Sequence, residues 1–281
     1  MIWLFPAAFC SITIALILKV NERRGGSRIL IAGANYVVAS AISFFMLGAR
    51  LGRPGPAALA LGGAAGIVYV LGFLLLMALI ARAPLAVPVT VARLSVALPV
   101  AVSILLWGEN PGIFQWLGIA LGLIAVILFG MSLSNAAHVS RGAGRFGLLL
   151  VSLFIVLGLG DVLLKAFREL SPDFDRLTFT WILFTVAAGF TWLLIGLRRI
   201  RFDARTFALG LALGVPNLFS TVFTLQALRS VPASIAFPFI NLAVIVGSTL
   251  VGLLVWKERP RRTGLAGLVI AGGAIVLLAL R

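Results

Sequence analysis

The chain has 281 residues, of which 62% are hydrophobic and only 11% are charged. That apolar share is far above the usual roughly 45–50% of a soluble domain, so a soluble globular protein is excluded. The net charge of +15 does not indicate nucleic acid, because the basic residues lie in short connections between apolar segments, where they set topology and meet anionic headgroups. The single cysteine, Cys10, rules out an intramolecular disulfide.

Ten apolar segments follow one another, each near the length that crosses about 30 Å of hydrocarbon as a helix. We therefore predict an all-α, multi-pass integral membrane protein with no room for a soluble domain. The first segment is read as a membrane helix rather than a signal peptide, because its basic residues follow the apolar run. The predicted spans are 2–19, 29–49, 57–80, 84–107, 112–132, 146–167, 177–197, 205–228, 232–256 and 263–280.

A W-x-E-x-P pattern closes the fourth span and recurs after the ninth, 149 residues later: Trp107, Glu109 and Pro111, then Trp256, Glu258 and Pro260. Five spans separate the two corners, and an odd number of crossings places them on opposite membrane faces. The sequence thus predicts two inverted-topology five-helix repeats, residues 1–135 and 141–281, as in many secondary transporters. Two pairs of small residues on the third and eighth spans repeat in the same way: Gly62 and Gly66, then Gly210 and Gly214.

At this point the chain resembles an EamA-like, ten-helix member of the drug/metabolite transporter superfamily. The resemblance rests on the duplicated halves, the short loops and the two acid-containing corners. It implies a central cavity lined largely by the third, fourth, eighth and ninth spans, and cytoplasmic termini. The positive-inside rule predicts the opposite orientation, since fifteen of the 23 Lys and Arg residues follow odd-numbered spans. A bacterial inner-membrane location is expected.

Arg93 is the main candidate for a functional residue, because it lies near the middle of the fourth span. An unpaired charge in hydrocarbon is costly, so an intramembrane arginine faces a cavity or has a partner. Its planar guanidinium could bind a substrate carboxylate or phosphate. The alternative is a structural role, pairing within the bundle or bonding carbonyls that the nearby prolines leave free.

Asp161 is the acid that lies clearly inside a span, and Lys165 follows it by four residues. That spacing allows a local ion pair on one helix face. Asp161 could instead be the counter-ion of Arg93, or a proton-coupling group. For Glu109 and Glu258 we favour a capping role, because an acid beside the start of a helix stabilises the positive end of its dipole.

Five further polar side chains lie at mid-membrane depth and are candidates for substrate binding: Asn35, Tyr36, Tyr69, Asn217 and Asn241. The last two rank highest because a neighbouring proline loosens the helix and frees backbone carbonyls. The same side chains could simply hold helices together.

These features favour a secondary active transporter that moves a small polar metabolite, amino-acid-like, zwitterionic or anionic, by alternating access. We expect a monomer or homodimer surrounded by membrane lipids, with proton coupling and no nucleic-acid partner. No metal or cofactor is expected. A lipid or polyprenyl-phosphate flippase is the alternative. Enzymatic function is disfavoured, since His138 is the only histidine and neither a serine–histidine pair nor an acid dyad is apparent.

Overall fold

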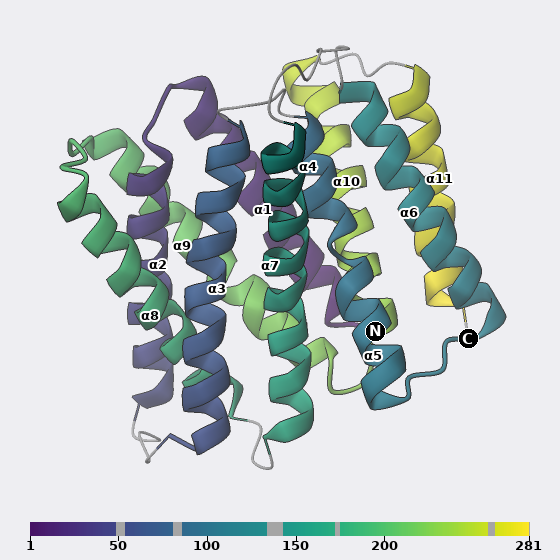
Figure 1. Ribbon diagram of the computed structural model, residues 1–281, viewed down its shortest axis with the longest axis horizontal. Helices are drawn as coiled ribbons and strands as arrows, with labels where there is room; N and C mark the ends of the chain where they lie inside the picture. The colour runs from purple at the N-terminus through teal and green to yellow at the C-terminus, as the bar shows by residue number, and fades with distance from the viewer. Residues whose placement is uncertain (49–53, 81–85, 134–142, 172–174, 258–261, 281) are drawn as a thin grey trace. The chain divides into compact units, whose positions relative to one another are not determined.

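The computed structural model describes residues 1–48, 54–80, 86–133, 143–171, 175–257 and 262–280, which form helices and connections without a strand (Figure 1). Ten of its segments are long and apolar enough to cross a membrane, which confirms the helical membrane class and each predicted span to within a few residues. The helices are α1 Leu4–Arg23, α2 Arg28–Leu47, α3 Pro56–Ile80, α4 Ala86–Leu94, α5 Ala97–Trp107, α6 Ile113–Leu133, α7 Ala143–Leu170, α8 Arg176–Leu197, α9 Ala204–Ala227, α10 Ala233–Trp256 and α11 Arg262–Ala279.

Short polar side chains mark where several helices begin. The Ser27 hydroxyl caps α2 by accepting from the Leu30 N–H, and Asp175 and Asp203 cap α8 and α9 in the same way, each accepting from an N–H three residues on. The first N–H groups of a helix have no partner within it, so such caps stabilise the starts of these apolar segments.

The fourth span differs from the single helix predicted for 84–107, because it breaks at Ser95 and Val96 into α4 and α5. In an unbroken helix the Ser95 carbonyl would accept from residue 99, but Pro99 has no N–H and its ring crowds that carbonyl. The Ser95 carbonyl accepts instead from the Leu98 N–H at 3.0 Å, in a tighter turn.

The helices pack as two compact units, each described here by itself. The first unit comprises Met1–Val70 and Leu163–Ser230, and the second comprises Leu71–Val162 and Val231–Arg281. Each unit contains helices from both predicted repeats, so packing and sequence repetition divide the chain differently. The repeats at 1–135 and 141–281 therefore stay a prediction about sequence.

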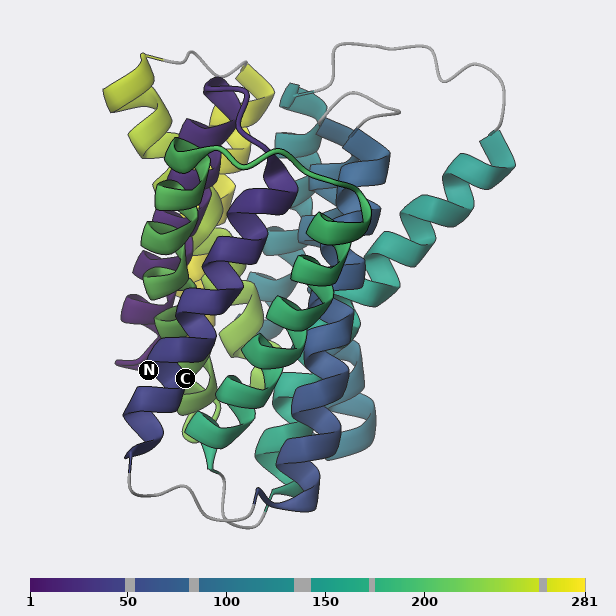
Figure 2. The same cartoon turned by 90° about the vertical axis from the view of Figure 1, so that its left-hand side faces the viewer.

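In the first unit, α2 lies between α8 and α9 (Figure 2), and glycines allow the backbones to approach closely. A Cβ built at Gly214 would lie 2.7 Å from the Asn35 carbonyl oxygen, and one at Gly66 would lie 2.6 Å from that of Leu183. The two contacts are related by the same shift of 148 residues in both partners. The glycines of the predicted small-residue pairs thus lie at helix–helix contacts, as such residues do in membranes.

In the second unit, α6 and α11 run side by side (Figure 1) and meet through another matched pair of glycines. A Cβ at Gly118 would lie 3.1 Å from the Ala274 carbonyl oxygen, and one at Gly267 would lie 3.2 Å from that of Ala125. A shift of 149 residues carries Gly118 to Gly267 and Ala125 to Ala274, so each helix contributes one glycine and one carbonyl to the contact. The contact is therefore reciprocal, as at a twofold interface.

The glycine contacts can be tested on α3. We expect Gly66→Ala to lower the apparent melting temperature of the purified protein by several degrees, because its Cβ would crowd backbone of α8 and overpacking costs about 1–3 kcal/mol. Gly63→Ala is the matched control, since a Cβ there meets nothing within 4 Å. Equal melting temperatures for the two variants would contradict this account of the packing.

Candidate functional site

Arg93 lies in the last turn of α4, immediately before the break in the fourth span. Its Nη1 donates to Oδ1 of Asn241 on α10 at 3.2 Å, and its guanidinium interacts electrostatically with the carboxylate of Asp161 on α7. A cation at this end of a helix is also favoured by the helix dipole. The second unit thus gathers three of the predicted site residues, from three helices, into a charged centre.

Asp161 reaches this centre because α7 packs tightly against the break. Gly158, about one turn earlier, faces the open turn: a Cβ there would lie 2.8 Å from the Ser95 carbonyl oxygen and 2.7 Å from the Leu98 Cβ. A larger residue at 158 would push α7 away from α4 and α5. Of the three roles predicted for Asp161, the electrostatic interaction favours that of a counter-ion to Arg93.

Asn241 is the third member of the centre and follows Pro238 by three residues. While its Oδ1 accepts from Arg93, its Nδ2 donates to the Phe237 carbonyl at 3.3 Å. Both ends of the amide are therefore used, and this fixes the side chain toward the arginine.

A small pocket adjoins the centre on the α5 and α6 side. Its volume is about 10 Å³, close to the minimum that admits one water molecule. Asn241 supplies its polar wall. The remaining lining comes from the break, α5, α6 and α10: Val96, Ala97, Val100, Ile119, Gly122, Leu123, Val126, Pro238 and Leu242. The space that this pocket leaves beside Asn241 is therefore smaller than a small metabolite.

The first unit holds a separate polar cluster. Asn217 Nδ2, on α9, donates to Asn35 Oδ1, on α2, at 3.0 Å, and the hydroxyls of Ser11 and Ser220 lie 2.7 Å apart. These contacts join α9 to α2 and to α1. Asn35 is buried and Asn217 is half-buried, so the amide pair has the properties of a helix–helix contact.

The two predicted tyrosines also lie in the first unit. Tyr36 is buried on α2 and its ring stacks on Phe184 of α8, with centroids 6.1 Å apart. Tyr69 is half-buried on α3.

Lys165, on α7, forms an ion pair with Glu169 at 2.6 Å. Lys165 therefore pairs with the acid four residues after it, Glu169. The sequence spacing had suggested the acid four residues before it, Asp161.

Glu109 caps a helix other than the one that follows it in the chain. Its two carboxylate oxygens accept from the N–H groups of Ala233 and Ser234, both at 2.8 Å, at the start of α10. At the start of α6 the side chain of Gln115 accepts from the Gly112 N–H instead. The capping role predicted for Glu109 is thus directed at α10, which carries Asn241.

The two W-x-E-x-P corners share a backbone turn. After Trp107, Gly108 has a left-handed conformation and its N–H bonds to the Ser103 carbonyl. After Trp256, Lys257 has the same conformation and its N–H bonds to the Gly252 carbonyl. Pro111 is buried. The rest of the second corner, Glu258 and Pro260, lies outside the described residues.

Sequence reasoning missed two features of the charged centre, the break itself and the contact at Gly158. The signal for the first was Pro99, five residues after the end of α4. The second had no signal, because a glycine in an apolar helix does not indicate which neighbour it faces.

Comparison with known proteins agrees with this structure. Residues 145–280 match the EamA-like transporter family. A curated protein of Haemophilus influenzae, described as an uncharacterized protein, is 24% identical over 288 aligned positions that cover 97% of this chain and 95% of that protein. A crystal structure with 17% sequence identity superposes with a TM-score of 0.79, covering 98% of this chain and 94% of its own, which shows a shared fold.

Ten of the described segments are able to span a membrane, which defines a multi-pass integral membrane protein, and the family match indicates one of the transporter type. Over residues 145–280 the chain is similar to the EamA-like transporter family. The predicted resemblance to the drug/metabolite transporter superfamily is thereby confirmed.

The pairing of Arg93 with Asp161 can be tested by charge removal. We expect Arg93→Gln and Asp161→Asn each to lower the apparent melting temperature, because each leaves one charge without its partner. The cost should be about 1–3 kcal/mol, below that of a fully buried pair since both side chains are partly accessible. The double variant should recover most of the loss. Additive losses in the double variant would show that the two charges are independent.

Proposed function

We propose that the protein is a secondary active transporter that moves a small polar metabolite, amino-acid-like, zwitterionic or anionic, by alternating access in a bacterial inner membrane. The observation that carries the proposal is the charged centre at the break of the fourth span. Broken helices with polar side chains at their ends are the usual ion and substrate sites of such transporters.

A substrate carboxylate would compete with the present partners of Arg93. The hydrogen bond to Asn241 uses one of the five guanidinium donors, and a carboxylate would bind through two parallel bonds. Asn241 could then turn its amide toward the substrate, beside the backbone that Pro238 loosens. The arrangement suits an anion or zwitterion better than a cation.

Displacement of Asp161 from Arg93 offers a route to proton coupling. A carboxylate that loses its counter-ion within the membrane is more stable in its neutral form. Binding of an anionic substrate to Arg93 would therefore favour proton uptake by Asp161, so that substrate and proton cross together. When the substrate leaves, the electrostatic interaction between Arg93 and Asp161 is restored and the proton is released.

Alternating access would come from two inverted five-helix repeats. The support is the set of reciprocal contacts, in which Gly62 and Gly66 meet α8 as Gly210 and Gly214 meet α2, and Gly118 meets α11 as Gly267 meets α6. Contacts that map onto each other under nearly the same shift of the chain, here 148 and 149 residues, are expected of duplicated halves. With five spans in each half, the halves have opposite topology, and exchanging their conformations exposes a central site to either face.

Transport in proteoliposomes tests the role of Arg93. We expect Arg93→Gln combined with Asp161→Asn to abolish saturable exchange of amino acids and small carboxylates, while the melting temperature stays near that of the wild type. Arg93→Lys, which keeps the charge but not the planar fork, should retain a small fraction of the activity. Thr13→Val is the control, because that hydroxyl bonds to the Phe9 carbonyl of its own helix.

Loss of Asp161 should separate coupling from binding. We expect Asp161→Asn to retain exchange of substrate across the liposome membrane but to lose accumulation driven by an inward proton gradient. The measurement is counterflow and gradient-driven uptake in the same preparation. Accumulation at the wild-type level would exclude Asp161 as the coupling group.

A flippase is the alternative function on the same scaffold, because Arg93 would also suit a phosphate headgroup. It predicts movement of a labelled phospholipid or polyprenyl phosphate between leaflets, with no saturable uptake of small solutes. That result in the same proteoliposomes would replace the proposed substrate class while leaving the site at Arg93.

A further inference from the structure

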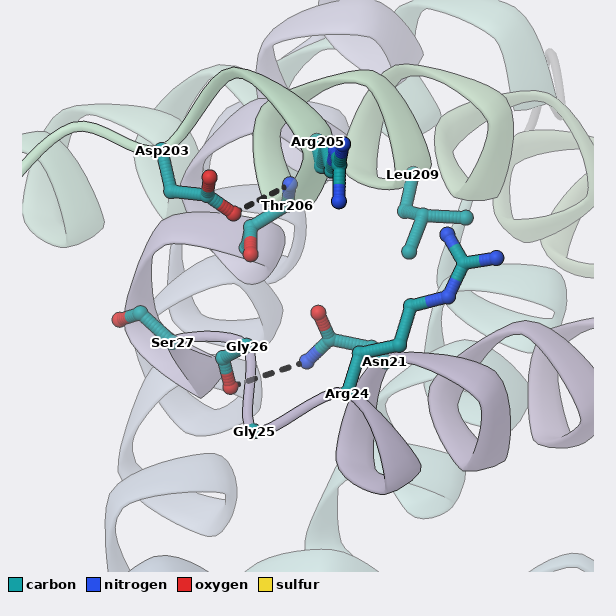
Figure 3. A pocket seen from close by; sticks show the side chains of 9 residues that line it. All are labelled: Asn21, Arg24, Gly25, Gly26, Ser27, Asp203, Arg205, Thr206 and Leu209. Atoms are coloured by element: carbon teal, nitrogen blue, oxygen red, sulfur yellow. Dashed lines mark hydrogen bonds between the residues drawn. The ribbon is translucent and has the colours of Figure 1, made fainter.

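A polar pocket lies in the first unit, where the connection between α1 and α2 meets the start of α9 (Figure 3). Its volume is about 610 Å³, far larger than the space beside the charged centre of the second unit. It is lined by Asn21, Arg24, Gly25, Gly26, Ser27, Asp203, Arg205, Thr206 and Leu209.

Two arginines make the pocket electropositive. Arg24, just after α1, and Arg205, in the first turn of α9, flank the same space in Figure 3. Arg24 forms no ion pair with another described residue. Arg205 stands at the positive end of the α9 dipole, where a cation is unfavourable, and the carboxylate of Asp203 offsets part of that cost through its electrostatic interaction with Arg205. An anionic ligand would stabilise Arg24 and would add to the single carboxylate near Arg205.

Asp203 is the one acid among the described lining residues, and its charge is already used by the start of α9 and by Arg205. Hydrogen bonds from the Thr206 hydroxyl, and then from backbone N–H groups, hold the pKa of Asp203 below its usual value. The carboxylate caps α9 by accepting from the Thr206 N–H at 2.8 Å. With two arginines and one aspartate, the lining keeps a net positive charge.

Asn21 supplies the observation that points to a ligand. The residue is only 2% exposed, and its Nδ2 donates to the Gly26 carbonyl at 3.2 Å. Among the described residues its buried Oδ1 has no hydrogen-bond partner, and in Figure 3 this oxygen is directed toward the space between Asn21 and Arg205. A buried acceptor without a partner is unfavourable, so a ligand that brings a donor would be stabilised there.

Gly26 keeps the space around that oxygen open. A Cβ at this position would lie 2.0 Å from Asn21 Oδ1 and 2.7 Å from Thr206 Oγ1. A side chain at 26 would therefore occupy the place beside the unpaired acceptor. The pocket thus combines cationic walls with one acceptor that needs a donor.

We propose that this pocket binds a phosphodiester that carries hydroxyl groups, namely the headgroup of phosphatidylglycerol. The phosphate would bind Arg24 and Arg205, and a glycerol hydroxyl would donate to Asn21 Oδ1. The pocket lies at the ends of membrane-spanning helices, among the basic connections, which is where headgroups meet a membrane protein. Leu209 adds an apolar wall toward the hydrocarbon.

Thermal stabilisation in a neutral detergent tests the phosphate contacts. We expect short-chain phosphatidylglycerol, but not phosphatidylcholine, to raise the melting temperature in a concentration-dependent way. Arg24→Gln and Arg205→Gln should each weaken the apparent affinity about tenfold, as the loss of one charge-assisted hydrogen bond does. Arg201→Gln is the matched control, because Arg201 is exposed near the same corner but does not line the pocket. An equal loss with the control, or equal stabilisation by phosphatidylcholine, would overturn the proposal.

A second comparison tests the donor to Asn21. Phosphatidylmethanol is a phosphodiester of the same charge whose headgroup has no hydroxyl, so the wild type should bind it several-fold more weakly than phosphatidylglycerol. Asn21→Ala should remove that preference while retaining the dependence on Arg24. No preference in the wild type would overturn the role of Asn21. If glycerol 3-phosphate stabilises as well as the lipid, the same chemistry is supported but the ligand is a soluble phosphate.

Discussion

Inside hydrocarbon, every backbone N–H and C=O must find a partner within the protein, and the structure depends on this constraint. It requires helices across the membrane, and it makes any interruption of a helix exceptional. The interruption at Ser95 and Val96 persists because a tighter turn satisfies the Ser95 carbonyl and because the glycine at 158 brings α7 against the open backbone. The charged centre lies beside this interruption of the fourth span.

Close approach of helices is the second feature on which the structure depends. With lipid as apolar as the side chains, helices associate through packing and polar contacts rather than through exclusion of water. Gly66 and Gly214 provide the packing, and the amide pair of Asn35 and Asn217 provides a polar contact between α2 and α9. Such contacts hold two helices together within the membrane.

The charged side chains within the membrane also have partners in the protein. Arg93 donates a hydrogen bond to the Asn241 amide and interacts electrostatically with the Asp161 carboxylate, and Glu109 accepts with both its oxygens at the start of α10, the helix that carries Asn241. Helix α10 therefore links the corner at Glu109 to a side chain within the membrane. The arginines near Asn21 lie outside this network, which suits a role in contact with lipid rather than in transport.

The sequence by itself determined the class of protein, the ten spans and the corners, because hydrophobic length and the turn residues are local properties of the chain. It also identified Arg93, Asp161 and Asn241 individually, since polar groups in apolar helices are rare. Only the tertiary structure decided that these three meet, that Glu109 caps α10, and that Lys165 pairs with Glu169. Those outcomes depend on which helix faces lie together, and the period of one helix does not specify its neighbour.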